Sequence, residues 1–143
     1  MNKVKIKLDK GAVMPFQSTE GAVGYDITAN SFKYDELHDL FIYGTGVHLE
    51  MPNAMYAEVH QRSSVADHSL ILSNCVGIID SDYRGEIILK FSPVAEDVNM
   101  FKYTIGDRIG QLIFKKKEVV DLIQSETLNE TKRNAGGFGS TGK

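Results

Sequence analysis

Short segments in which hydrophobic and polar residues alternate run through most of this 143-residue chain. The first, over residues 3–8, places three lysines on one face and Val, Ile and Leu on the other, which is typical of a half-buried β-strand. Similar patterns predict further strands over residues 47–51, 55–60, 86–91, 108–114 and 118–123. Glycine and proline separate these segments at short intervals, and that rhythm is typical of an all-β sandwich or barrel.

One short stretch and the C-terminal end depart from this pattern. Residues 63–68 predict a helical turn with Ser63 or Ser64 as its cap. The composition changes near Gln124, so we expect a packed domain over residues 1–123 and a flexible arm over residues 124–143.

The arm ends in a segment whose composition suits a nucleotide. Residues 133–143 contain four glycines, one phenylalanine, two hydroxyl side chains and a basic residue at each end. A glycine-rich backbone brings its N–H groups close to phosphates, while the aromatic ring offers a flat apolar face. The small number of apolar residues in this segment also favours a disordered tail. Disorder and nucleotide binding are compatible, because a mobile arm can become ordered over a ligand.

Charge and cysteine content narrow the function classes. The formal net charge of −3 gives no sign of the excess positive charge that binding to a nucleic-acid backbone requires. No segment is long and apolar enough to span a membrane, and we expect no signal peptide because the lysine-rich start lacks a following apolar run. The single cysteine, Cys75, excludes an internal disulfide and indicates the cytoplasm. The four histidines lack a metal-ligand spacing, which speaks against a zinc site.

Two polar segments are candidates for chemistry. Residues 76–87 predict a hairpin with a polar turn, in which Asp80 is either a capping residue or a general base at a pocket edge, with Tyr83 as a wall for the ligand. A calcium loop is disfavoured because Arg84 stands where an oxygen ligand is needed. Arg62, Ser63 and Ser64 follow a strand directly, as either a phosphate cradle or a simple helix cap.

Taken together, five segments of the chain strongly resemble the trimeric deoxyuridine triphosphatase (dUTPase) family. The resemblance covers residues 21–142 and keeps the five family motifs in order. In this sequence they occupy residues 24–29, 62–64, 77–86, 106–113 and 136–142.

The resemblance implies a fold, an assembly and an activity. Each subunit is expected to be a distorted jelly roll, similar to a β-barrel, within a homotrimer that has three shared active sites. The arm of one subunit is expected to close over a site formed by its two neighbours. The implied reaction is Mg²⁺-dependent hydrolysis of dUTP to dUMP and diphosphate, which keeps uracil out of DNA and supplies dUMP for thymidylate synthesis.

The resemblance also assigns roles to individual residues. Asp80 is expected to activate the attacking water, and Asp26 to meet Mg²⁺ only through water. Uracil and deoxyribose are expected to contact Asn74, Gly77, Ile78, Ile79, Tyr83, Ile88 and, by stacking, Phe138. The phosphates or the water are expected to contact Arg62, Ser63, Ser64, Gln111, Arg133, Gly139, Ser140 and Thr141.

Two features stand outside the family pattern. Asn134 occupies a position where the family usually has glycine, and we expect arm closure to survive because Asn tolerates left-handed backbone angles. Residues 32–43 match no motif. Two alternative functions stay open: a related deaminase acting on dCTP, and a regulatory module that uses residues 32–43 to bind a protein partner.

Overall fold

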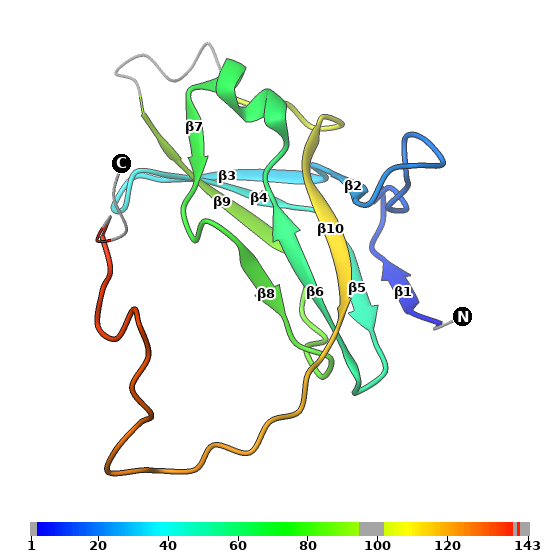
Figure 1. The fold of residues 1–143 in the computed structure, drawn as a ribbon. Helices are drawn as coiled ribbons and strands as arrows, with labels where there is room; N and C mark the ends of the chain where they lie inside the picture. The colour runs from blue at the N-terminus through cyan, green and yellow to red at the C-terminus, as the bar shows by residue number, and fades with distance from the viewer. Residues whose placement is uncertain (1–2, 95–101, 139, 141–143) are drawn as a thin grey trace.

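The computed structural model describes residues 3–94, 102–138 and 140. In these ranges the chain forms ten β-strands and one 3-10 helix, and Figure 1 shows their arrangement. The elements are β1 (Lys5–Leu8), β2 (Tyr25–Thr28), β3 (Ser31–Asp35), β4 (Leu40–Gly44), β5 (Val47–Glu50), β6 (Met55–His60), η1 (Ser63–His68), β7 (Leu70–Leu72), β8 (Gly77–Ile79), β9 (Ile88–Pro93) and β10 (Arg108–Lys116).

The strands form two four-stranded antiparallel sheets and a two-stranded ribbon. One sheet has the order β2-β10-β6-β8, the other has the order β3-β4-β9-β7, and β1 pairs with β5. Figure 1 shows β3, β4 and β9 lying behind β6 and β10, so that the two sheets face each other. This arrangement confirms the expected all-β, jelly-roll-like fold.

The core lies between the two sheets and follows from the period-two patterns. Along β6, Met55, Ala57 and Val59 are buried while the residues between them are half-buried. Tyr43 and Phe91 of the other sheet are completely buried. The Tyr43 hydroxyl donates a hydrogen bond of 3.0 Å to the carbonyl oxygen of Tyr103, which satisfies the one polar atom of this side chain inside the core.

A buried threonine fixes the corner where the chain passes from β4 to β5. The Thr45 hydroxyl donates to the carbonyl oxygen of Ile87 over 2.8 Å and accepts from the backbone N–H of Val47 over 3.2 Å. The backbone N–H of Ile87 in turn donates to the carbonyl oxygen of Val47 over 2.9 Å. These bonds tie the segment before β9 to the start of β5.

Three local expectations are wrong. Residues 118–123 form no strand, because beyond Lys116 the chain has no neighbouring edge to pair with, and Leu122 is 94% exposed. Residues 76–87 form no hairpin, because β8 pairs with β6 whereas β9 pairs with β4 and β7. The helical turn over residues 63–68 is confirmed, but its N-cap is Arg62 and no side chain caps it.

Other observations add to the sequence-based picture. Residues 32–43, which matched no motif, lie in the β3–β4 hairpin. Within the described ranges, no helix has the length and apolar character that crossing a membrane requires. Among the described residues, the last backbone hydrogen bond between the body and the C-terminal segment joins the Lys117 N–H to the Ala54 carbonyl oxygen over 2.9 Å. The exact division into a domain and an arm stays a prediction.

We expect Gly110→Ala to destabilise the fold. A Cβ at this position in β10 would lie 2.7 Å from Leu89 Cδ2 and 3.0 Å from the His60 carbonyl oxygen, so buried groups must move apart. The expected loss in the free energy of unfolding is about 1–3 kcal/mol, measured by urea denaturation. Gly21→Ala is the control, because a Cβ there meets no atom within 4 Å. Equal stability of the two variants would contradict the packing argument.

Candidate active site

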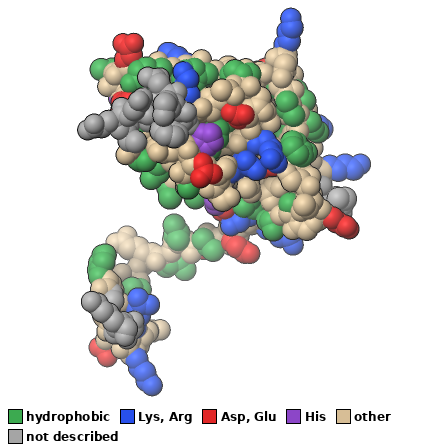
Figure 2. Space-filling model, turned by 90° about the horizontal axis from the view of Figure 1, so that it is seen from above, with side chains coloured by type: hydrophobic (Ala, Val, Ile, Leu, Met, Phe, Trp, Pro, Cys, Tyr) green, Lys and Arg blue, Asp and Glu red, His purple; other side chains and the backbone are tan. Residues whose placement is uncertain are grey.

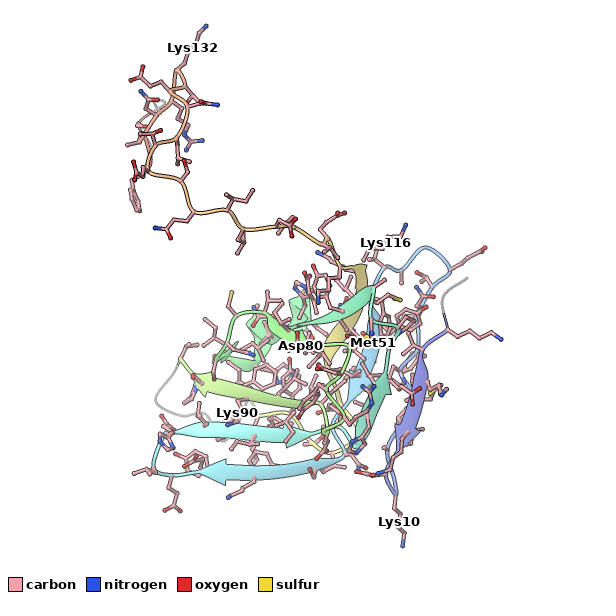
Figure 3. All side chains as sticks on the ribbon, turned by 90° about the horizontal axis from the view of Figure 1, so that it is seen from below. Lys10, Met51, Asp80, Lys90, Lys116 and Lys132 are labelled. Carbon is pink, nitrogen blue, oxygen red and sulfur yellow. The ribbon has the colours of Figure 1, made fainter. Side chains whose placement is uncertain are left out.

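Asp80 follows directly after the last residue of β8. The pairing of Ile79 with Ala57 of β6 fixes the end of this strand, and the backbone N–H of Tyr83 donates to the Asp80 carbonyl oxygen over 3.2 Å. The Asp80 carboxylate is exposed and has no hydrogen bond or ion pair with any side chain in the described ranges. Figure 3 shows Asp80 on the body of the molecule. An unpaired carboxylate in this position is free to accept a proton from a ligand or a water.

A row of pockets flanks Asp80. One of about 230 Å³ lies between Asp80, Tyr83 and the exposed side chains of Ile78 and Ile88. Next to it, a second of about 350 Å³ is bordered by Asn74 and again by Ile88. On its other side, Asp80 borders a third pocket of about 370 Å³. Apolar walls with a few polar groups are typical of a site for a flat heterocycle joined to a polar group.

The ring of Tyr83 is held in place by its own turn. Its hydroxyl donates to the Glu86 carbonyl oxygen over 3.1 Å. A Cβ at Gly85 would lie 2.8 Å from Tyr83 Cε2 and would overlap the phenol oxygen. The ring therefore occupies space that only a glycine at position 85 leaves open.

A second group of polar residues surrounds Asp26 in β2. Arg62 Nε donates to Asp26 Oδ1 over 3.2 Å, and Arg108 Nη1 donates to Asp26 Oδ2 over 2.9 Å. Ser18 Oγ donates to Asp26 Oδ2 over 2.7 Å and accepts from Arg108 Nη1 over 2.9 Å. Arg62 Nη1 also donates to Ser64 Oγ over 3.3 Å. This buried carboxylate thus holds two guanidinium groups side by side.

The electrostatics of this group keep Asp26 ionised. Burial raises the pKa of the Asp26 carboxyl, but hydrogen bonds from Ser18 and Arg108 and the charge of Arg62 outweigh it. The pKa therefore lies below its ordinary value. Gln111 of β10 lies opposite Asp26 in the sheet register, so it belongs to the same group. Two arginines beside amide and hydroxyl groups form a setting suited to phosphates.

The two groups lie at opposite ends of β6. Asp80 lies beside Tyr56 near the start of the strand, and Arg62 follows its end. From Tyr56 to Arg62 there are six residue steps, which span about 20 Å at about 3.3 Å per residue. Direct hydrogen bonds require about 3 Å, so one ligand group cannot contact both Asp80 and Arg62 of the same chain.

The arm carries the remaining expected residues. Arg133 Nε donates to the Gly136 carbonyl oxygen over 2.9 Å, while Phe138 and Ser140 are exposed. Asn134 has φ = 41°, which agrees with the left-handed angle expected of it. Figures 2 and 3 show the arm standing clear of the body. Gly139 and Thr141 lie outside the described residues.

The structure thus sorts the expected residues into three places. The pocket row is lined by Asn74, Ile78, Ile79, Asp80, Tyr83 and Ile88, and Gly77 is buried next to Ile78 at the start of β8. The Asp26 group contains Arg62, Ser64 and Gln111, with Ser63 next to them in η1. Sequence analysis missed Arg108 and Ser18. The motif over residues 106–113 contains Arg108 and was a usable signal, whereas Ser18 lies outside every motif.

No metal centre is preassembled in the described residues. They contain no cluster of three or more His, Cys, Asp or Glu side chains that would hold an ion. Asp26 is the expected contact, and both of its oxygens already accept hydrogen bonds. A metal ion at Asp26 would therefore be held mainly by water and by a ligand's own oxygens.

Known proteins similar to this chain point to one family. A family model described as dUTPase matches residues 10–142. A deoxyuridine 5'-triphosphate nucleotidohydrolase of Finegoldia magna is 41% identical, with 98% of this chain and 99% of the relative covered. One from Helicobacter pylori strain Shi470 is 35% identical, with 98% and 97% covered. A solved mutant dUTPase of Staphylococcus bacteriophage 80alpha, with dUpNHpp, has a TM-score of 0.81 at 22% identity, and both chains are covered completely.

We expect Gly85→Ala to displace the Tyr83 ring. The new Cβ would occupy the space of the phenol ring, which must move by about 1 Å or more to restore ordinary contact distances. A crystal structure of the variant measures the shift. Gly21→Ala is again the matched control and leaves the ring in place. An unmoved Tyr83 ring in Gly85→Ala would contradict the description of this wall.

Proposed function

The chain belongs to the dUTPase family and hydrolyses dUTP to dUMP and diphosphate. For this reaction we propose that Asp80 activates the attacking water. The observation that carries this assignment is the position of the Asp80 carboxylate. It is unpaired within the described residues and lies between pockets that continue on both sides of it. A carboxylate in this position can accept a proton from water as that water attacks the α-phosphorus.

The pocket row beside Asp80 is proposed to hold the nucleoside. Asn74 and the backbone of Gly77, Ile78 and Ile79 would contact the uracil edge, while Ile88 would form part of the pocket wall. Cytosine would leave buried polar groups unpaired in such a site. The Tyr83 ring would pack under the deoxyribose and leave no room for a ribose 2′-hydroxyl.

The Asp26 group is proposed to bind the phosphates. Arg62, Ser63, Ser64 and Gln111 would contact phosphate oxygens or the attacking water. Arg108 belongs to the same assignment, because its guanidinium lies beside Asp26 and is partly exposed. The chemistry of phosphoryl transfer requires mainly positioning and charge neutralisation, and this group offers both.

Magnesium is proposed as the cofactor, and the residues present fit it. Mg²⁺ keeps several waters and binds through one or two carboxylates together with substrate phosphates. Asp26 fits this pattern in the water-mediated form, because its oxygens are already engaged. When bound, the ion neutralises charge on the triphosphate. A solved dUTPase of phage phi11 of S. aureus is described with a structural Mg(II) ion.

We infer a homotrimer with shared sites from the separation of the two groups. About 20 Å of extended chain, from Tyr56 in β6 to Arg62 beyond its end, separates Asp80 from Arg62 in one chain, so a complete site needs Arg62 from another chain. The exposed side chains of Val119, Val120, Leu122 and Ile123 also favour association, because apolar surface of this kind is normally covered. The arm would close over a site of its neighbours, with Phe138 on uracil and Arg133, Gly139, Ser140 and Thr141 on the γ-phosphate.

Two further expectations stay predictions. The cytoplasmic location rests on the single Cys75. A regulatory protein partner would meet the β3–β4 hairpin, where Leu37 is 86% exposed. The related phage proteins are described as controlling the transfer of virulence genes. Pull-down experiments with and without nucleotide test whether a partner binds and whether its binding depends on this hairpin.

The assignment of Asp80 is tested by a turnover assay. We expect the protein with Mg²⁺ to release diphosphate from dUTP and not from UTP or dTTP, and EDTA to suppress the reaction. Asp80→Asn should lower kcat by about 10²- to 10⁴-fold, because the amide cannot accept the proton. Asp121→Asn is the control, since this carboxylate lies in the exposed segment after β10. An Asp80→Asn variant with full activity would contradict the assignment.

Shared sites are tested by mixing two inactive variants. One is Asp80→Asn, and the other ends after Thr131 and lacks the segment with Arg133 and Phe138. Random trimers from equal amounts should contain intact sites in about one quarter of positions, because Asp80 and the arm come from different chains. Co-expression followed by the dUTP assay measures this recovery. No recovery in stable mixed trimers would show that each chain closes its own site.

A further inference from the structure

The turn that follows Asp80 is folded around one arginine side chain. Arg84 Nη1 donates to the carbonyl oxygens of Ser81 and Tyr83 over 2.7 Å and 3.1 Å. The same nitrogen lies 3.3 Å from the carbonyl oxygen of Leu49 in β5. The position of Arg84 therefore determines the shape of the segment that carries Asp80, and its attachment to β5.

A histidine of β5 holds the backbone of Arg84. His48 Nδ1 lies 3.0 Å from the Arg84 carbonyl oxygen, and Nε2 lies 3.0 Å from Asp9 Oδ2. A carbonyl oxygen and a carboxylate oxygen both accept hydrogen bonds. A neutral imidazole has one N–H donor, whereas the imidazolium has two. Only the protonated ring satisfies both partners.

The surroundings of His48 contain charges of both signs. Lys7 of β1 lies opposite His48 in the register, and its Nζ lies 3.5 Å from Asp9 Oδ1. Lys5 pairs with Glu50 over 2.7 Å, and Arg84 approaches from the turn. Lys5, Lys7, Glu50, Arg84 and His48 border one groove of about 460 Å³, which gives the ring access to protons from solvent.

The balance of these groups favours the imidazolium. The hydrogen bond with Asp9, followed by that with the Arg84 carbonyl, raises the pKa of His48, while burial and the charge of Lys7 oppose the shift. The hydrogen bond with His48 in turn lowers the pKa of Asp9. The contribution of His48 to stability is complete below its ordinary pKa and is lost as the pH rises through the higher pKa of the folded state.

We propose that the His48 imidazolium is a positioning residue for Asp80. It links the Arg84 carbonyl oxygen to the carboxylate of Asp9, which directly follows β1, and so holds the turn over residues 80–85 in place. This inference rests on the proposed role of Asp80. When the ring gives its proton to solvent, one of the two acceptors faces a nitrogen lone pair. The attachment of the turn then weakens, and the Asp80 carboxylate loses part of its fixed position.

The link is tested first without nucleotide. An NMR titration of the histidine ring nitrogens should give His48 a pKa above about 6.5. The backbone amides of Ser81, Tyr83 and Arg84 should shift with the same midpoint. In His48→Gln these amide shifts should disappear from that pH range. His38 lies in the distant β3–β4 turn, so its titration is the internal control and should leave these amides unchanged. A His48 pKa at or below 6.5, or amides that do not follow it, would overturn the proposal.

The catalytic consequence is tested by pH profiles of kcat for dUTP. The wild-type profile should fall severalfold as the pH rises through the NMR midpoint of His48, and His48→Gln should lack this inflection. A merely structural role would lower Tm and keep the inflection, which would overturn the proposal. A protein without any dUTP turnover would overturn the proposed function and the catalytic half of this inference. The nucleotide-free titration tests the hydrogen-bond link independently.

Discussion

The length of β6 is the constraint on which the organisation of the site depends. This strand is paired on both sides, with β10 and with β8, so its two ends cannot approach each other. Asp80 lies beside one end, and Arg62 extends from the other. Chemistry on a triphosphate requires both a base and cationic groups at one ligand. A rigid strand therefore leaves each chain with one half of the proposed site, and in the proposed trimer a neighbouring chain would supply the other half.

The segment that carries Asp80 lies where the chain changes from one sheet to the other. β8 belongs to one sheet and β9 to the other, so the intervening turn bridges two layers instead of closing a hairpin. A hairpin turn is supported by its own two strands, whereas this turn needs outside support. Arg84 and Thr45 provide it through backbone carbonyl oxygens. Asp80 is exposed to ligand, while the turn that follows it is held by the exposed Arg84 and the buried Thr45.

The sequence correctly predicted strands that can be recognised from their own alternation of hydrophobic and polar residues. The alternation along β6 and β10 gave correct strands, because half-buried strands keep one face toward the core. The pattern over residues 118–123 is equally regular, yet no edge of the same chain receives it. Pairing depends on neighbours that a local pattern does not contain. For the same reason the turn over residues 80–85 was mistaken for a hairpin.

The motifs predict candidate residues for the site, whereas the contacts between these residues were not predictable from the sequence. The motifs contain Asp80, Tyr83 and Arg62, but the role of Ser18 and the clamp of two arginines on Asp26 arise only from folding. His48 follows the same rule. Its pattern position indicates a strand residue facing solvent, and nothing in the sequence nearby places Asp9 and the Arg84 carbonyl on its two nitrogens.

The proposed arm closure also follows from an entropic argument. The arm stands clear of the body, so ordering each of its residues costs about 1–2 kcal/mol that only new contacts offset. In the proposed assembly those contacts are made to uracil and to the γ-phosphate. The product dUMP keeps the base and loses the two outer phosphates, so the contacts of Arg133 and its neighbours end with the reaction. An arm that is ordered only by the substrate would therefore exclude bulk water while the triphosphate is intact and release the product afterwards.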